Sequence, residues 1–146
     1  MVAPTVAVRM DQAIREYIRS SNNADAQKIA ACLHTDAIHY YPNFPKFVGA
    51  SAIAAHFAKR VRENGICWTV DQIVVDADRC IGVLEFTLFA GKDLILRGLE
   101  LYQFEPNTLL ILEVRPYTAA PVDFGLPHQE LQDFDYAGRG YPTTRP

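Results

Sequence analysis

Two glutamates in the second half of the chain could supply acid–base chemistry. Glu100 and Glu113 both interrupt apolar segments whose side chains alternate with the period of two that indicates β-strands. If Pro106 and Asn107 form the tip of the hairpin between these segments, the two glutamates lie directly opposite each other. Two carboxylates so close together in a dry environment resist ionising together, so one should keep its proton near neutral pH.

Two more charged residues are expected on the same face of this sheet. A second hairpin with its tip at residues 91–92 places Glu85 opposite Gly98, and the first hairpin places Arg115 opposite that glycine. Because Gly98 has no side chain, Arg115 has room to reach Glu85, and it could also shield the two central glutamates. Exposed rows of charge are ordinary on antiparallel sheets, so a solvated face is the alternative interpretation.

The other face of the predicted sheet is apolar. Its members come from the same three strands and are Leu84, Leu99, Leu101, Leu112 and Val114. In the simplest interpretation this apolar face packs against helices, and the charged face is exposed to water.

The elements that would position these residues change character along the chain. Helices are predicted over residues 9–20, 25–33 and 51–63, with a short strand over residues 37–41 before the third helix. Asp25 is the expected cap of the second helix, and Gly65 the expected end of the third. Longer strands are predicted over residues 67–76, 80–90, 94–104 and 109–117. This order predicts an α+β fold with helices on one face of a curved antiparallel sheet.

Length and composition exclude several classes of function. The chain has 146 residues, 49% of them hydrophobic and 21% charged, which predicts one folded domain. A net charge of −3 leaves no basic stripe to hold nucleic acid or an anionic membrane. Apolar runs stop well short of the roughly 20 residues that a membrane span needs, and the N-terminus lacks the features of a secretory signal.

Cysteine usage indicates a cytoplasmic protein. Cys32, Cys67 and Cys80 form no paired motif, which predicts reduced, buried thiols rather than a disulfide framework. The spacing of His, Cys and acidic residues suggests no metal site, and no glycine-rich phosphate loop is present in the sequence. We therefore expect neither a metal nor a cofactor.

Residues 118–146 are expected to form an extended, irregular tail that follows a domain over residues 1–117. The tail holds four of the nine prolines and shows no hydrophobic period. Its expected anchors are aromatic: Phe124, Phe134, Tyr136 and Tyr141. We expect it to lie across its own subunit or a partner, with a lid over a pocket as the alternative.

Several segments resemble the NTF2-like superfamily, which includes ketosteroid isomerase, scytalone dehydratase and the SnoaL-type polyketide cyclases. The resemblance covers roughly residues 8–117. It is carried by residues 34–42, by Gly49 with residues 52–57, and by the strand segments 98–104 and 113–117. It implies a cone in which three N-terminal helices pack on a curved sheet, and it is more specific for fold than for function.

The resemblance implies that Glu100 points into a concave pocket. In ketosteroid isomerase an aspartate at the matching position stays protonated and donates to an oxyanion. The apolar face described above would then be convex, and covering it implies a homodimer. The aspartate that acts as the general base of that enzyme is replaced here by Tyr41, directly before Pro42. Tyrosine is a poor base at neutral pH but a good donor, and scytalone dehydratase also has a tyrosine on this strand.

Further side chains are expected around the same pocket. Tyr17 on the first helix approximately matches the tyrosine of the isomerase oxyanion hole, and His56 on the third helix could reach the pocket mouth. His39 lies on the same side of its strand as Tyr41. The other expected lining residues are Glu85, Arg115, Tyr102, Trp68 and Tyr117. Ordinary core packing is the alternative explanation for the aromatic members of this group.

These residues favour a cofactor-independent enzyme that moves a proton beside the carbonyl of a small apolar compound, by isomerisation, dehydration or cyclisation. Glu113 or His56 would accept the proton, while protonated Glu100, with Tyr41 or Tyr17, would stabilise the oxyanion. One alternative is a non-catalytic homodimer that binds a small apolar ligand in the same cavity. Another is a structural dimerisation domain whose cone is filled by side chains.

Overall fold

The computed structural model describes residues 3–42, 44–119 and 127–146, and it confirms the α+β class. Within these ranges three helices and seven strands follow one another as α1 (Val6–Asn22), α2 (Ala26–Ala31), β1 (Leu33–Tyr41), β2 (Phe44–Val48), α3 (Ala50–Asn64), β3 (Cys67–Asp76), β4 (Ile81–Ala90), β5 (Leu94–Phe104), β6 (Ile111–Thr118) and β7 (His128–Gln129). The predicted helices and long strands are therefore present, and the short strands β2 and β7 are additional.

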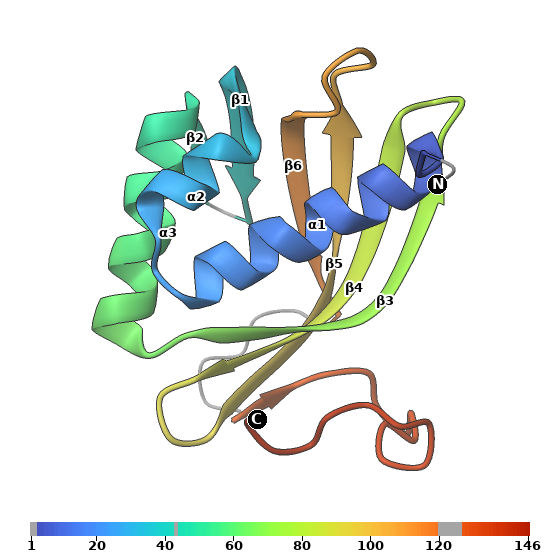
Figure 1. Cartoon of the computed structure of the whole chain (residues 1–146). Coiled ribbons are helices and arrows are strands. Elements are labelled where there is room, and N and C mark those ends of the chain that lie inside the picture. Colours follow the sequence, from blue (N-terminus) through green and yellow to red (C-terminus); the bar gives the residue numbers. More distant parts are fainter. Residues whose placement is uncertain (1–2, 43, 120–126) are drawn as a thin grey trace.

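The strands form one curved sheet in the order β2-β1-β6-β5-β4-β3, with β7 beside β5. Helix α1 crosses one face of this sheet, and α3 stands beside β1 and β2 (Figure 1). The sheet is mixed rather than wholly antiparallel, because β1 runs parallel to β6 and β7 runs parallel to β5. We call the face toward the helices the inner face, and the opposite one the outer face.

Local sequence signals account for the helix ends. The Thr5 side chain accepts a hydrogen bond from the Val8 N–H at the start of α1, and Asp25 caps α2 in the same way through Lys28. Helix α3 ends at Gly65, whose φ of 58° is a left-handed conformation that glycine adopts without strain. The predicted cap and the predicted stop are both confirmed.

Hydrogen bonds to β3 and close packing against β4 hold α1 on the sheet. The amide of Asn22, at the last position of α1, accepts from the Trp68 N–H at 2.9 Å and donates to the Trp68 carbonyl at 2.8 Å. Further along the helix, Ile14 lies so close to Gly82 that an added Cβ would stand 2.7 Å from its Cδ1. These contacts fix the helix that carries Tyr17.

The predicted pairing of Glu100 with Glu113 is wrong. Glu100 lies opposite Pro116, and Glu113 lies opposite Gln103. The hairpin loop is longer than a two-residue turn, because the Glu105 N–H bonds to the Leu110 carbonyl and the Glu105 side chain accepts from the loop N–H groups. A β-bulge between Gln103 and Phe104 shifts the register by one more residue.

The second predicted register is wrong by one residue. Ala90 pairs with Leu94, so the loop has three residues, 91–93, and Glu85 lies opposite Leu99 rather than Gly98. Gly98 does not make room for Arg115: a Cβ there would stand 2.7 Å from the Phe86 ring and 2.5 Å from the Tyr117 carbonyl. Gly98 instead permits the close packing of that ring.

These shifts change the composition of the two faces, because a one-residue slip turns side chains to the opposite side. Leu84 and Val114 are buried on the inner face with Glu100, whereas the prediction placed them on the other face. Leu99 lies on the outer face and is 45% exposed. Leu112 is the extra residue in the bulge, since Ile111 pairs with Phe104 and Glu113 with Gln103.

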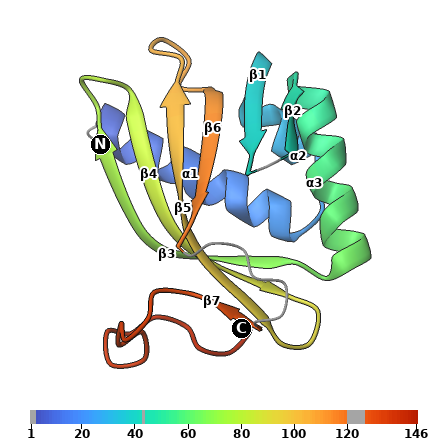
Figure 2. The same ribbon diagram turned by 180° about the vertical axis from the view of Figure 1, so that it is seen from behind.

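The C-terminal segment 127–146 folds back on the chain's own sheet, as Figure 2 shows from behind. Its aromatic rings pack together, with ring centroids of Phe134 and Tyr136 4.6 Å apart and those of Tyr136 and Tyr141 5.5 Å apart. Tyr141 donates to Glu85 on the outer face at 2.6 Å. Phe124, the fourth expected anchor, lies outside the described residues.

A buried arginine connects this segment to the sheet. Arg97 on the outer face donates to Glu130 at 3.2 Å and to the Pro142 carbonyl at 2.9 Å, and its guanidinium lies 4.0 Å from the centre of the Tyr136 ring. It also donates to Thr87 on β4 at 2.7 Å. The tail therefore satisfies a cation that the sheet alone would leave exposed.

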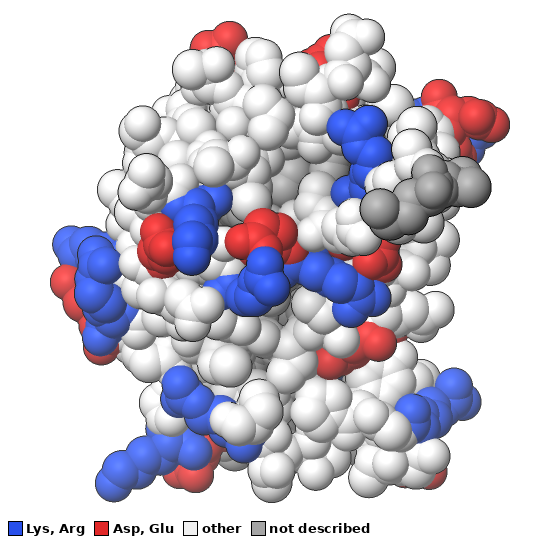
Figure 3. Space-filling view, in the orientation of Figure 1, with Lys and Arg blue, Asp and Glu red and all other residues white. Residues whose placement is uncertain are grey.

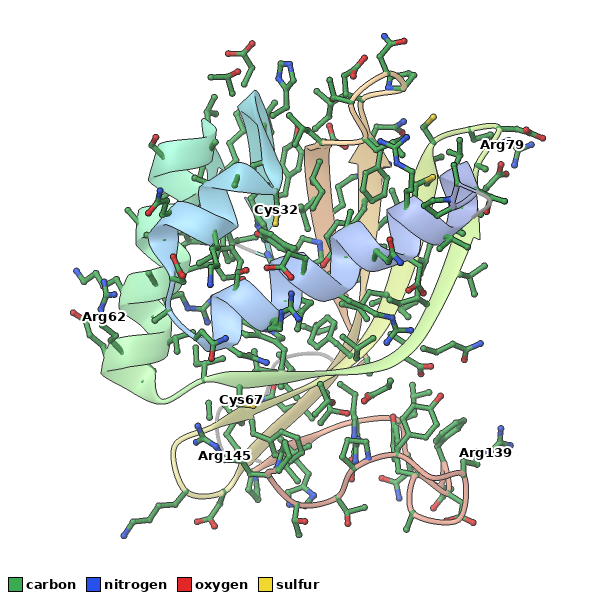
Figure 4. All side chains as sticks on the ribbon, viewed as in Figure 1. Cys32, Arg62, Cys67, Arg79, Arg139 and Arg145 are labelled. Carbon is green, nitrogen blue, oxygen red and sulfur yellow. The ribbon has the colours of Figure 1, made fainter. Side chains whose placement is uncertain are left out.

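Within the described ranges, no helix is both long and apolar enough to cross a membrane. Lys and Arg side chains are interspersed with Asp and Glu on the face that Figure 3 shows. Cys32, Cys67 and Cys80 are all free, and they are half-buried rather than fully buried as predicted. Figure 4 shows Cys32 and Cys67 on separate elements, near α2 and at the start of β3.

Candidate functional site

A buried acid lies on the inner face of β5. Glu100 is 4% exposed and accepts a short hydrogen bond from the hydroxyl of Tyr102, two residues along the same strand. Burial raises the pKa of Glu100 from 4.5 to about 7, and the bond from Tyr102 opposes that rise. Glu100 is therefore largely protonated just below neutral pH, and in that form it can donate a hydrogen bond.

A neutral, buried histidine lies on β1. His39 Nδ1 lies 2.8 Å from the carbonyl oxygen of Tyr40. A carbonyl only accepts, so Nδ1 carries the proton and Nε2 presents a lone pair. Burial lowers the pKa of His39 to about 3, so the ring is neutral at physiological pH. Its Nε2 atom is buried and has no hydrogen-bond partner among the described residues.

Two tyrosine hydroxyls share this lack of a partner. Tyr17 Oη from α1 and Tyr41 Oη from the end of β1 are buried and make no hydrogen bond within the described part of the chain. Burial raises the pKa of both phenols above its ordinary value of 10, so each hydroxyl keeps its proton and remains a donor. Leaving such groups unpaired costs free energy, which a ligand with complementary groups would recover.

One ring brings the members of this group together. Phe57 on α3 has ring-centroid distances of 5.8 Å to Tyr17, 4.9 Å to His39 and 6.3 Å to Tyr41. The Tyr17 ring in turn lies 6.1 Å from that of Tyr102, the residue that bonds to Glu100. We call Tyr17, His39, Tyr41, Glu100 and Tyr102 the interior cluster.

Two further predicted residues lie next to the interior cluster. Trp68 is buried, with its ring 5.6 Å from that of Phe57. His56 is half-buried, stacks on Phe47 at 4.1 Å and lies 5.3 Å from the Tyr41 ring. Burial lowers the pKa of His56, and nearby cations lower it further.

A cavity of about 650 Å³ lies beside the interior cluster, and its lining comes from the C-terminal end of β1 and from β6. Tyr41 belongs to both the cavity wall and the cluster. Another wall residue, Pro116, is the direct cross-strand partner of Glu100. The volume is in the range of small-molecule sites, and tyrosines and prolines supply much of the lining.

Four charged or aromatic residues predicted to line the site lie away from Glu100. Glu113, Arg115 and Tyr117 line the cavity from its outer side, where Glu113 and Arg115 form an ion pair at 2.9 Å. Glu85 is on the outer face and accepts from Tyr141 of the tail. The structure thus does not bring Glu113 or Glu85 together with Glu100, because the strand registers differ from the predicted ones.

Sequence reasoning placed His39 in the pocket but did not identify its free nitrogen. That nitrogen is fixed by a bond to the neighbouring Tyr40 carbonyl, which no sequence pattern indicates. Arg60, whose guanidinium lies 5.8 Å from the Tyr41 ring centre, was also missed. Its position four residues after His56, on the same face of the predicted helix, was the available signal.

Histidines, cysteines and acids of the described ranges form no group of three that could hold a metal ion. The geometry therefore assigns no metal-binding role to the interior cluster. Its own groups are two phenolic donors, an imidazole acceptor and a carboxyl group that titrates near neutrality.

Residues 14–110 match the family described as the SnoaL-like domain. The chain is a member of this family. A protein of unknown function with a cystatin-like fold from Methylobium petroleophilum is 39% identical, with a TM-score of 0.74 over 94% of this chain and 93% of that one. No curated protein matches the chain significantly.

More distant structures show the same fold as this SnoaL-like domain. A proposed ketosteroid isomerase from Kribbella flavida has 18% identity and a TM-score of 0.69, over 83% of this chain and 85% of that one. An epoxide hydrolase from M. tuberculosis has 15% identity and a TM-score of 0.68, over 80% of this chain and 82% of that one. The family match over residues 14–110 confirms the predicted SnoaL-like resemblance, and these structures share the fold.

Proposed function

We propose that this SnoaL-like domain is an enzyme that uses its own side chains to move a proton beside the carbonyl of a small, largely apolar compound. The observation that carries the proposal is the interior cluster, in which two buried donors and one buried acceptor have no partner among the described residues and lie beside an acid with a pKa of about 7. Isomerisation, dehydration and cyclisation all need these elements: a proton acceptor, and donors for the oxygen that gains charge.

Each group has one role in the proposed reaction. The ligand occupies the cavity with its carbonyl toward Tyr41, and the Tyr41 and Tyr17 hydroxyls donate to the carbonyl oxygen. Protonated Glu100 supports the same oxygen as charge develops on it. His39 Nε2 takes the proton from the adjacent carbon, because its lone pair has no hydrogen-bond partner among the described residues. His39 therefore takes the role that the sequence predicted for Glu113 or His56.

Proton exchange tests this proposal without knowledge of the natural substrate. We expect the protein to accelerate exchange of the α-protons of 2-tetralone with D₂O, measured by NMR. His39→Gln should lower the rate about 100-fold, the usual contribution of a general base. Tyr41→Phe should lower it about tenfold, since one hydrogen bond is lost. The exposed His128 provides the control, and His128→Gln should leave the rate unchanged.

Binding is followed separately through Trp68, the single tryptophan, which lies next to Phe57. Binding of 2-tetralone without exchange above the buffer rate would contradict catalysis. It would favour the alternative function, a non-catalytic protein that holds a small apolar ligand. Equal exchange rates for the wild type and His39→Gln would contradict the role of His39.

Whether the protein is an enzyme or only binds a ligand, we propose that it is a homodimer formed through the outer face. Exposed apolar side chains on this face support the proposal: Val74 is 59% exposed, Leu99 45% and Tyr117 58%. Sedimentation equilibrium should show a dimer, and Leu99→Glu should shift it to monomer while the circular dichroism spectrum is unchanged. Glu63→Lys, on the exposed surface of α3, is the control and should remain dimeric. A monomeric wild-type protein at micromolar concentration would contradict the proposal.

A further inference from the structure

The α3 helix brings a positive charge to the solvent side of the interior cluster. Arg60 is half-buried, and its guanidinium carbon lies 5.8 Å from the centre of the Tyr41 ring. Tyr41 is itself half-buried, whereas Tyr17, His39, Glu100 and Tyr102 are buried. Tyr41 also lines the cavity, so it is the residue through which Arg60 lies near a ligand bound there.

Among the described residues Arg60 forms no ion pair, and the polar group on which its side chain acts is the Tyr41 hydroxyl, whose pKa it lowers against the larger effect of burial. Other cations nearby are neutralised. Lys59 pairs with Glu63 at 3.9 Å, and Arg115 pairs with Glu113 at 2.9 Å. A guanidinium stays charged at all accessible pH values and has five N–H donors, so an unpaired one is suited to an oxyanion.

The groups that face Tyr41 leave this charge unopposed below neutral pH. The titratable groups near the Tyr41 ring are His39 from β1, His56 and Arg60 from α3, Glu100 from β5 and Tyr17 from α1, and the apolar rings are Phe57, Phe44 and Phe47. Glu113 and Arg115 of β6 share the cavity wall with Tyr41, and their charges pair with each other at 2.9 Å. His39, with a pKa of about 3, is neutral, and Glu100, with a pKa of about 7, is mostly protonated.

Burial is the main cause of the pKa shifts of His39, His56 and Tyr41, and Arg60 makes a smaller contribution to each. It lowers the pKa values of His39 and His56, and it opposes the effect of burial on the pKa of Tyr41. Charge interactions in a protein interior are stronger than in water, so a cation 5.8 Å from the Tyr41 ring favours negative charge on an oxygen bound at that residue.

We propose that Arg60 makes this site select ligands whose oxygen beside Tyr41 carries negative charge, namely phenolates and enolates, over their neutral forms. The inference rests on the proposed function, in which the ligand oxygen binds at Tyr41. Arg60 acts by favouring the charged form at that oxygen, so enolisable ketones and acidic phenols are the substrate class it fits. The same preference lowers the barrier to forming an enolate from a bound ketone.

The test uses 4-nitrophenol, whose phenol and phenolate forms absorb at different wavelengths and interconvert near neutral pH. Difference absorbance measures how much of the bound probe is phenol and how much is phenolate. The measurement is made below pH 7, where Glu100 is mostly protonated. We expect wild-type protein to bind the phenolate about tenfold or more tightly than the phenol, a shift of one pKa unit or more for the bound probe. Arg60→Gln should reduce this preference to the part that the Tyr41 and Tyr17 hydroxyls supply, and Arg60→Lys should retain more of it.

Lys59→Gln is the matched control, because it removes the same charge from the neighbouring exposed position of α3. It should leave the phenolate preference unchanged. An unshifted titration of the bound probe in the wild type, or an equal shift in Arg60→Gln, would overturn the role of Arg60. If 2-tetralone still binds and exchanges in that case, the proposed function stands and only the charge selection fails.

Discussion

Glu100→Gln should stabilise the protein increasingly as the pH rises from about 4.5 to about 7. The native state holds the proton of Glu100 up to a pKa of about 7, whereas the unfolded state releases it near 4.5. Over that interval the native state binds more protons, so the wild type loses stability as pH rises. The difference of about 2.5 pKa units corresponds to at most about 3 kcal/mol, which the glutamine variant avoids.

His39 makes the free energy of unfolding change with pH in the opposite direction, so its contribution must be separated from that of Glu100. Its native pKa of about 3 lies below its ordinary value of 6.5, so protonation of the unfolded state destabilises the protein as pH falls. We therefore compare Glu100→Gln with wild type at each pH by urea denaturation, since the His39 contribution is common to both. Glu63→Gln, an exposed change on α3, should show no such trend. A stability difference that stays constant from pH 4 to pH 8 would contradict a sheltered Glu100.

Arg97→Met should lower the free energy of unfolding by about 3 kcal/mol, the order of magnitude for breaking a buried ion pair. The side chain of Arg97 is 5% exposed, and methionine would keep its apolar stem but lose the bonds to Thr87, Glu130 and the Pro142 carbonyl. The change should also release the C-terminal segment, because Arg97 contacts it at three places.

Urea denaturation measures the first effect, and limited proteolysis within residues 127–146 measures the second. Arg139→Met is the matched control: Arg139 lies over the Phe134 ring at 4.5 Å within the same segment but is exposed. We expect it to cost less than about 1 kcal/mol. Similar losses for the two variants, with unchanged proteolysis, would show that Arg97 does not hold the tail.

The elements of the fold could be predicted from local periodicity, whereas the strand registers could not. Helical spacing and alternation located α1, α3 and the four long strands to within a few residues. The β5–β6 loop is set by the Glu105 side chain and by Leu109 at a φ of 58°, a conformation that the residue type does not indicate. The parallel pairing of β1 with β6 joins distant segments and has no local signal.

The same distinction applies to the site. Glu100 and Tyr102 are two residues apart on a strand, so alternation alone predicts that they share a face. The partner of Glu100 depends on the register, and an error of three residues placed Glu113 inside when it lies outside. Arg97 is buried because the C-terminal segment supplies its partners, 33 and 45 positions later in the chain.

The central claim is that Glu100 is sheltered from water and keeps its proton until near-neutral pH. Titration of the side-chain carboxyl carbon, by NMR of protein labelled with ¹³C-glutamate, reports this directly, and Glu100→Gln assigns the resonance. The structure predicts a midpoint at a pKa of about 7 for Glu100. A midpoint near 4.5, the ordinary value for a hydrated glutamate, would show that the side chain is solvated and would remove the basis for the proposed chemistry.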